Sequence, residues 1–425
     1  MELTSAIIKN KKSYNFLIFA CTFMWVIMMG SKNIYTAEYI EIGNLFNVSK
    51  PQASLAMTFY FITYSAVQVL LFFYMGKVNI KWYMLISTVL SGIVTVIVAL
   101  ATELWQLWWI LAINGILQAG VWGMCTAVLD KYLPITMKAK ANMIMNIGTA
   151  ASGIISYGSA SLFVSFKTLA SPFTFLGIIL SFSAIIFYIA VNNCSKLHKE
   201  NQKNIKDDQV ETATVSEQKQ SLPFTLKTSK RRTIFYIATF ILSVVAHFVF
   251  YGALNWIPSM LEENFNLKTE IATIISVLAP LATTIGPVIA IYHCEKHSNF
   301  IYVGLSYSLV ASIFALIMMF VYNVNIILSL GVLILYLIVL QGLVTIIFSV
   351  ISYKLSQYIN AGAHSGLMNA AGGISAGIAP PIFGAIIEGA SWQINYLVIF
   401  GISIAIAATS AAILYLLKNK KLNKN

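Results

Sequence analysis

Long apolar segments alternate with short polar ones along the whole chain of 425 residues. The apolar segments typically reach about 20 residues or more, the length at which an α-helix crosses the hydrocarbon core of a bilayer. The first of them is too long for a cleaved signal peptide, and others follow it. The pattern therefore predicts twelve membrane-spanning helices, at residues 14–40, 52–76, 81–101, 104–130, 139–164, 170–192, 233–259, 268–292, 299–321, 324–352, 363–388 and 391–417.

The composition supports this interpretation. Hydrophobic residues make up 58% of the chain and charged residues only 10%, with a mean hydropathy of +0.79. The surface of a water-soluble domain needs more charge than this. The expected fold class is an all-α polytopic membrane protein.

A polar segment divides the chain into two halves of similar length. Its sequence, "CSKLHKENQKNIKDDQVETATVSEQKQ", is rich in charge and typical of a poorly ordered linker. We therefore expect a six-helix bundle at 1–193, a cytoplasmic linker at 194–232 and a second six-helix bundle at 233–425.

A faint internal repeat relates the two halves. "MNIGTAASGI" (Met145–Ile154) and "MNAAGGISAGI" (Met368–Ile378) lie six predicted helices apart, which favours two pseudo-symmetric bundles built as parallel repeats. Small residues let helices pack closely, so packing is one interpretation of these segments. A role for Asn146 and Asn369 in lining a binding site is the other.

Charge indicates the orientation. The formal net charge of +12 is concentrated at the ends and in the linker, so the positive-inside rule places both termini in the cytoplasm. The turns on the outer side are instead acidic: Glu38, Glu41, Glu103, Glu262, Glu263 and Glu388. The sequence offers no basic aromatic surface for nucleic acid. The four cysteines have no metal-ligand spacing, and we expect neither a metal nor a cofactor.

Three motifs add to this organisation. They are "SKNIYTAEYI" (Ser31–Ile40), "NGILQAGVWGMC" (Asn114–Cys125) and "YGALNWIPSML" (Tyr251–Leu261), in the first, fourth and seventh predicted spans. Six plus six helices with a cytoplasmic linker resemble the major facilitator superfamily, and the three motifs resemble its organophosphate:phosphate antiporters, such as the glycerol-3-phosphate transporter. The resemblance implies alternating access around a central site near the middle of the bilayer.

Lys32 lies roughly two-thirds of the way along the first predicted span. One interpretation is snorkelling, in which the flexible stem carries the ammonium to the outer interface. The other is an anion-binding group that faces a water-filled cavity, because an ionisable residue at this depth is costly unless it is paired or hydrated. The resemblance matches Lys32 and Asn33 to a Lys-Asn pair in the anion site of the antiporters.

The chain also departs from that family. Ser31, Phe250 and Thr149 stand where the resemblance implies two arginines and a histidine. A guanidinium binds phosphate with two hydrogen bonds, whereas a single lysine is a compact point charge. A carboxylate, another monoanion or a zwitterion is therefore at least as compatible with the site as a phosphate ester.

His247 lies near the middle of the seventh predicted span. It either bonds a neighbouring backbone group or faces the cavity as a ligand or proton carrier, since imidazole titrates near neutral pH. The first and seventh helices are equivalent in the two halves, so Lys32 and His247 are expected to face one cavity. Further candidates, which could instead be packing or interface residues, are Tyr35, Tyr64, Gln68, Trp122, Tyr251 and Asn255.

These observations predict a secondary transporter for a small organic anion or zwitterion, working as an antiporter against phosphate or as a proton symporter. It is expected to be a monomer in the plasma membrane, and the richness in lysine, asparagine and isoleucine favours a bacterial source. An exporter of drugs or metabolites and a non-transporting sensor of a sugar phosphate remain alternatives. No nucleotide-binding glycine loop and no catalytic constellation are visible, so an enzyme is not expected.

Overall fold

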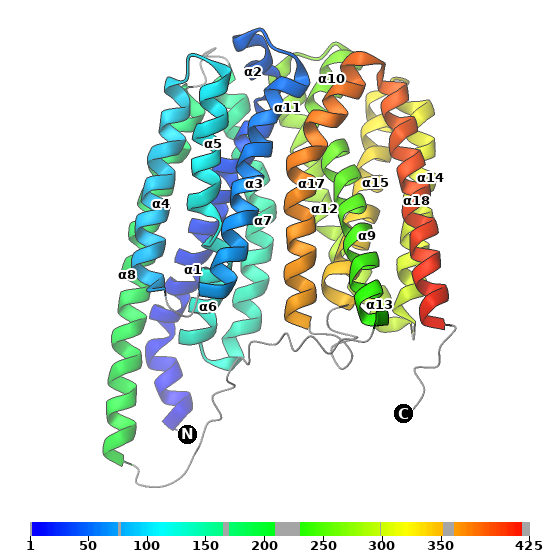
Figure 1. Ribbon diagram of the computed structural model, residues 1–425. Coiled ribbons are helices and arrows are strands. Elements are labelled where there is room, and N and C mark those ends of the chain that lie inside the picture. The colour runs from blue at the N-terminus through cyan, green and yellow to red at the C-terminus, as the bar shows by residue number, and fades with distance from the viewer. Residues whose placement is uncertain are drawn as a thin grey trace.

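The computed structural model describes residues 2–74, 78–164, 170–208, 230–297, 299–351 and 361–418, and every element in these ranges is helical. Long helices run side by side between two ends of the molecule, and the first turns of α1 lie at the same end as the last turns of α18 (Figure 1). The short helices α2 (Tyr39–Phe46) and α10 (Ile257–Phe265) lie at the opposite end, called the distal end below.

The first half of the chain contains seven further helices and one 3-10 turn within the described residues. They are α1 (Glu2–Ala37), α3 (Lys50–Tyr74), α4 (Ile80–Ile97), η2 (Val98–Leu100), α5 (Leu104–Gln118), α6 (Val121–Tyr132), α7 (Ile135–Val164) and α8 (Ala170–Asp208).

The second half is built in the same way. Its elements besides α10 are α9 (Lys230–Asn255), α11 (Thr269–Ser276), α12 (Leu278–Thr283), α13 (Ile285–Lys296), α14 (Phe300–Val321), α15 (Ile326–Thr345), the π-helical turn η3 (Ile346–Val350), α17 (Ala361–Gly389) and α18 (Trp392–Lys418).

Ten helical segments of the described chain are long and apolar enough to span a membrane. Two further helices, α3 and α7, contain 25 and 30 residues. At about 1.5 Å per residue both exceed the roughly 30 Å of a hydrocarbon core. The described chain thus contains the twelve long helical segments that the hydrophobic pattern predicts.

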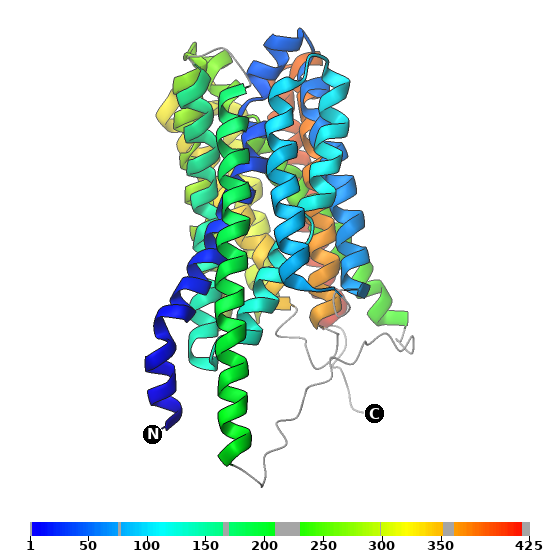
Figure 2. The same cartoon turned by 90° about the vertical axis from the view of Figure 1, so that its left-hand side faces the viewer.

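Helix α8 differs from the expectation for the linker. It continues to Asp208, so the first part of the segment predicted to be poorly ordered is helical, and α8 projects beyond the neighbouring helices (Figure 2). The residues after Cys194 are polar but include lysine, glutamate and glutamine, which are good helix formers. Residues 209–229 of the linker lie outside the described chain.

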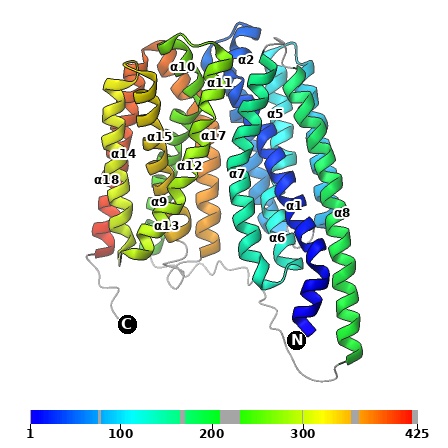
Figure 3. The same cartoon turned by 180° about the vertical axis from the view of Figure 1, so that it is seen from behind.

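The helices form two groups that meet along a central seam. Helices α1 to α8 pack mainly on one another, and so do α9 to α18 (Figures 1 and 3). Glycines permit the closest approaches: a Cβ atom on Gly92 of α4 would lie 2.5 Å from the carbonyl oxygen of Gly177 in α8. Across the seam, α3 packs on α17 and α7 packs on α11 and α12.

Two consecutive prolines, Pro380 and Pro381, lie inside α17. A proline has no N–H, so the carbonyl four residues earlier loses its helical donor. For Pro381 this carbonyl belongs to Gly377, and the hydroxyl of Thr58 in α3 donates to it across the seam. Trp256 donates its indole N–H to the carbonyl of Pro380 at 3.0 Å. Pro381 therefore leaves the carbonyl of Gly377 as an acceptor for α3, and the bond from Trp256 adds a second contact to the same part of α17.

Candidate functional site

Lys32 of α1 extends toward the seam between the two groups. Its ammonium lies over the ring of Phe61 in α3, 5.3 Å from the ring centroid. Phe61 in turn lies against α17, because a Cβ atom on Gly377 would be 3.1 Å from the Cβ of Phe61. Neither of the two ion pairs in the described chain involves Lys32, whose side chain is partly exposed. Within the described chain the ammonium therefore has an aromatic face beside it and no carboxylate as an ion-pair partner.

A buried polar network holds the residues next to Lys32 and Phe61. Tyr60 donates its hydroxyl hydrogen to Oε1 of Gln118 at 2.7 Å. The Nε2 of Gln118 donates to Ser91 at 2.9 Å and to Ser31 at 3.3 Å, and Ser91 donates to Oδ1 of Asn114 at 2.6 Å. Because these groups are buried and satisfied by one another, they fix α1, α3, α4 and α5 in register.

His247 of α9 bonds a neighbouring backbone group through one ring nitrogen and leaves the other nitrogen for a ligand or a proton, the two roles considered from the sequence. Its Nδ1 lies 2.8 Å from the backbone oxygen of Ser243, which is the local backbone bond. Its Nε2 is directed at α17, where a Cβ atom on Gly372 would lie only 3.1 Å away. Within the described chain no hydrogen-bond partner of Nε2 is present, so this nitrogen is free for a ligand or a proton.

A tyrosine lies near each of Lys32 and His247. Tyr64 lies edge-on to Phe61 at 6.4 Å between ring centroids, and Tyr251 stacks on His247 at 6.1 Å. The two ring pairs approach each other through adjacent glycines of α17: a Cβ atom on Gly373 would lie 2.6 Å from the Oγ of Ser65, next to Tyr64 in α3, and one on Gly372 would lie 3.1 Å from the Nε2 of His247 in α9. Four candidates from the sequence thus form two contact groups, Lys32 with Tyr64 through Phe61 and His247 with Tyr251, which lie on either side of Gly372 and Gly373 in α17.

Gln68 and Asn369 are also brought together. The amide nitrogen of Asn369 in α17 donates to Oε1 of Gln68 in α3 at 3.1 Å. Both lie on the same two helices as Thr58 and Gly377. This pair is another direct polar contact between the two halves.

The remaining candidates lie elsewhere or are occupied by packing contacts. Tyr35 is fully buried and donates its hydroxyl hydrogen to the carbonyl of Ala53 at 3.0 Å. Trp122 packs on Trp25 at 4.6 Å, and Asn255 is buried at the end of α9. Asn33 is partly exposed, and its carbonyl accepts from Thr36 at 2.6 Å. The side chain of Asn146 lies outside the described part of the chain.

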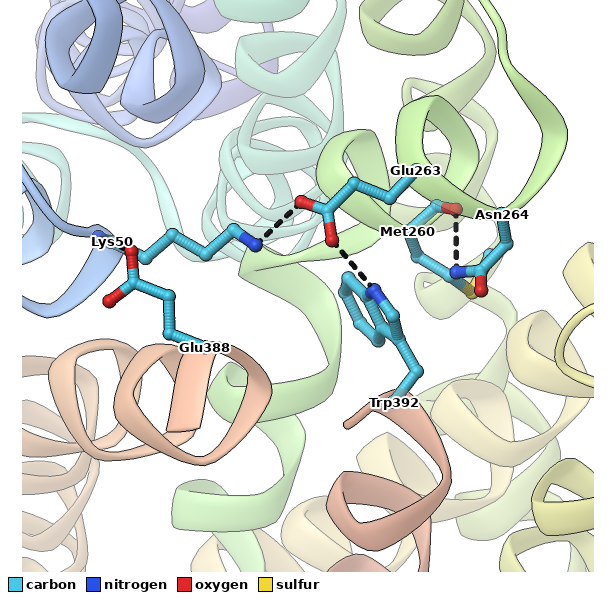
Figure 4. A network of polar contacts seen from close by, with 6 residues as sticks. All are labelled: Lys50, Met260, Glu263, Asn264, Glu388 and Trp392. Atoms are coloured by element: carbon cyan, nitrogen blue, oxygen red, sulfur yellow. Dashed lines mark hydrogen bonds and ion pairs between the residues drawn. The ribbon is translucent and has the colours of Figure 1, made fainter. Parts of the chain in front are cut away.

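At the distal end, charged groups tie the two halves together (Figure 4). The ammonium of Lys50, at the start of α3, lies 2.5 Å from Oε1 of Glu263 in α10. The other oxygen of Glu263 accepts from the indole N–H of Trp392 at 2.9 Å. The backbone N–H of Lys50 donates to Glu388 of α17 at 2.9 Å. We call Lys50, Glu263, Glu388 and Trp392 the distal latch.

Aromatic packing reinforces this closure. The ring of Tyr39 in α2 lies 5.3 Å from that of Trp256, which precedes α10 and bonds α17. Gly384 of α17 leaves no room for a side chain, since a Cβ atom there would lie 3.2 Å from the backbone nitrogen of Pro51. The distal end is therefore shut at several points in this conformation.

Two carboxyl groups at the distal end have raised pKa values. Glu38, between α1 and α2, exposes only 4% of its surface, and its burial, together with the neighbouring Glu41, raises its pKa to about 8. Burial also raises the pKa of Glu262, with Glu263 and Glu270 adding to the effect, while a hydrogen bond from Thr269 and the charge of Lys50 oppose it. Both carboxyls therefore hold protons more tightly than exposed ones do.

Comparison with known proteins identifies the family pattern. The family model described as the Major Facilitator Superfamily matches residues 18–363. No protein with a curated description matches the sequence.

Solved transporters share the fold at low sequence identity. A bacterial homologue of the human lysosomal transporter Spinster, in an inward-facing and occupied conformation, gives a TM-score of 0.76 at 13% identity, over 96% of this chain and 99% of its own. The nucleoside transporter NupG, in a mutant form, gives a TM-score of 0.66 at 16% identity, over 94% of this chain and 99% of its own. A D-xylose–proton symporter gives a TM-score of 0.68 at 11% identity, over 95% of this chain and 97% of its own. At these identities the likeness shows the fold, and the all-helical polytopic fold predicted from the sequence is confirmed.

Proposed function

Because the chain belongs to the Major Facilitator Superfamily of secondary transporters, which are not enzymes, we propose that it moves a small organic anion or zwitterion by alternating access. The moving bodies in this proposal are the bundles at 1–193 and 233–425, joined by the linker at 194–232. The setting is a bacterial plasma membrane with both termini in the cytoplasm, and the working unit is a monomer.

The observation that carries the proposal is the position of Lys32. A cation at membrane depth is costly without a counter-charge. The face of Phe61, 5.3 Å away, offsets part of that cost, by about 0.5–2 kcal/mol for a cation over a ring. An anionic substrate that enters the seam would complete the pairing. This supports the anion-binding interpretation of Lys32 over snorkelling.

The acidic residues argue against a cationic substrate. Within the described spans they lie near helix ends: Asp130, Glu270, Glu295 and Glu388. An exporter of cationic drugs needs a carboxylate near the centre, where the described chain has Lys32 and His247. A sensor for a sugar phosphate needs more positive charge than one lysine supplies.

The coupling ion has two candidates. The motifs that resemble the organophosphate:phosphate antiporters favour exchange against phosphate, and the free Nε2 of His247 favours proton symport. In either case the closed distal latch represents one end state of the cycle, the one in which the substrate reaches the site from the end that carries the termini. Opening the latch while the opposite end closes would complete the cycle.

Solute counterflow tests the proposal. Proteoliposomes loaded with unlabelled anions would be tested for uptake of the same anion in labelled form, with wild type and Lys32→Ala compared at equal protein content. Uptake of at least one anion by wild type, and its loss in Lys32→Ala, is the expected result. Counterflow only of cations, or anion counterflow that Lys32→Ala leaves intact, would overturn it.

A further inference from the structure

Aromatic side chains lie beside both Lys32 and His247. Phe61 and Tyr64 come from α3, and Tyr251 and His247 from α9. Neighbouring rings reinforce both pairs: Tyr60 stacks on Tyr64 at 5.6 Å between centroids, and Phe250 lies edge-on to Tyr251 at 5.3 Å. Tyr64, Tyr251 and His247 are partly exposed, so their rings are not entirely consumed by packing.

Several polar side chains of the described chain near this surface already have hydrogen-bond partners. Gln68 and Asn369 bond each other, and the Nδ1 of His247 is taken by Ser243. Ser31 belongs to the buried network around Gln118. A substrate with many hydroxyl groups would leave several of them desolvated and unpaired at such a surface. A phosphate ester would want a second cation, and both arginines of the chain, Arg231 and Arg232, lie at the start of α9, about 15 residues before His247.

We infer that the site selects an organic anion whose carbon skeleton carries a planar aromatic ring, with its carboxylate on Lys32 and its ring against Tyr64 and Tyr251. The inference rests on the proposed function and narrows its substrate class. Aromatic rings stack on or meet tyrosine edges with an attraction beyond simple burial, because their quadrupoles are complementary. Since Tyr64 and Tyr251 belong to different halves, such a ring also bridges the two moving bodies.

Pairs of ligands that share a carboxylate but differ in the ring distinguish the contribution of the ring to binding from that of the charge. Detergent-purified protein would be titrated with benzoate, phenylacetate and 3-phenylpropanoate, each against its cyclohexyl counterpart, and with hexanoate and glycerol-3-phosphate, using thermal unfolding to obtain apparent dissociation constants. The cyclohexyl acids keep the carboxylate and the bulk but lose the planar ring. We expect the aromatic acid of at least one pair to bind about three- to tenfold more tightly than its partner.

Variants assign this preference to the two tyrosines. Tyr64→Leu and Tyr251→Leu are expected to abolish it, and Tyr64→Phe and Tyr251→Phe to keep it. Tyr302→Leu is the matched control, because Tyr302 lies on α14 with 46% of its surface exposed. Lys32→Gln is expected to weaken all of the acids, aromatic or not.

The outcomes separate this inference from the proposed function. Equal binding of aromatic and cyclohexyl acids, a ring preference that survives both leucine variants, or tighter binding of glycerol-3-phosphate would overturn the inference. Anion counterflow that depends on Lys32 would still stand in that case and would uphold the broader proposal. Absence of any Lys32-dependent anion binding would overturn both.

Discussion

Thr58 of α3 donates a hydrogen bond to the carbonyl oxygen of Gly377 in α17, 2.5 Å away. That carbonyl lies four residues before Pro381, whose ring nitrogen carries no hydrogen, so α17 cannot satisfy it internally. One residue of the first half thus completes the hydrogen bonding of a helix in the second. The seam at this point is a specific polar contact as well as an apolar one.

The first prediction concerns this bond. Thr58→Val keeps the shape of the side chain but leaves the Gly377 carbonyl unpaired in the membrane interior. It should lower the free energy of unfolding by about 1–3 kcal/mol, whereas Thr58→Ser should retain most of it. Thermal unfolding in detergent measures the difference. Thr409→Val is the control, since the hydroxyl of Thr409 bonds the carbonyl of Ala405 on an exposed surface where no proline interrupts the helix. Equal losses in Thr58→Val and Thr409→Val would contradict the role of Pro381.

The second prediction concerns the distal latch. Lys50 and Glu263 are 22% and 40% exposed, so their ion pair contributes about 0.2–1 kcal/mol to the closed state. Removing the charge with Lys50→Met should raise the population of the open state by up to about fivefold. Tyr39→Cys reports it, because Tyr39 is buried between the halves and the four native cysteines are also buried. Labelling with a membrane-impermeant maleimide should be faster in the Lys50→Met background.

Two further variants test the specificity of that effect. Lys81→Met removes a lysine whose contacts, Asn192 and Tyr188, lie within the first half, so it should leave labelling unchanged. Exchanging the charges, with Lys50→Glu and Glu263→Lys together, should restore the slow rate in part. If Lys81→Met accelerates labelling as much as Lys50→Met does, the latch does not control access.

The sequence could predict the fold, and could select part of the candidate site, because both choices depend on hydropathy. Spans about 20 residues long are visible as apolar runs. A lysine or histidine inside such a run is conspicuous, which is why Lys32 and His247 could be selected without a structure. The polar residues Asn114 and Gln118, four positions apart in an apolar segment, indicate a polar contact on one helix face, but their spacing does not indicate which helices supply the partners.

The remaining features depend on which helices become neighbours. Pro381 indicates that one carbonyl of the eleventh span lacks its helical donor, but nothing in the local sequence indicates that Thr58 donates the hydrogen bond to it. Lys50 and Glu263 are ordinary charges at membrane edges until the fold places them together. Hydropathy also cannot say which face of a helix points inward, so Tyr35 looked like Tyr64 although the structure buries its hydroxyl against Ala53.

The third prediction concerns the buried network. Gln118→Leu removes the acceptor of Tyr60 and the donor to Ser31 and Ser91. The buried hydroxyl of Tyr60 then loses this partner, whereas Ser31 and Ser91 still donate to Met28 and Asn114. We expect a loss of about 2–3 kcal/mol of unfolding free energy. Because Ser31 and Tyr60 directly precede Lys32 and Phe61, the ligand-induced stabilisation should shrink as well.

Thermal unfolding with and without ligand measures both effects in Gln118→Leu. Gln393→Leu, at an exposed position of α18, should change neither. A destabilised Gln118→Leu variant that still binds with wild-type affinity would show that the network supports the fold without positioning Lys32.

The last prediction follows from Glu38. A folded carboxyl with a pKa of about 8 keeps its proton over a pH range in which the unfolded chain, with an ordinary value of 4.5, has released it. The folded state therefore binds more protons than the unfolded one between these values, and stability falls as the pH rises through this range. Above pH 8 the full cost of a buried charge is present. Glu262 contributes with the same sign.

Glu38→Gln replaces the carboxyl with a neutral group of the same shape. Wild type should lose stability from pH 5 to pH 9, and the variant should lose less and be the more stable of the two at pH 9, by about 1.4 kcal/mol for each unit by which the pKa is raised. Thermal unfolding across the pH series measures both slopes, with the exposed Glu295→Gln as the control. If Glu38→Gln showed the same slope of stability against pH as wild type, the Glu38 carboxyl would already be ionised in the folded protein. The buried site between α1 and α2 would then have to hold a counter-charge.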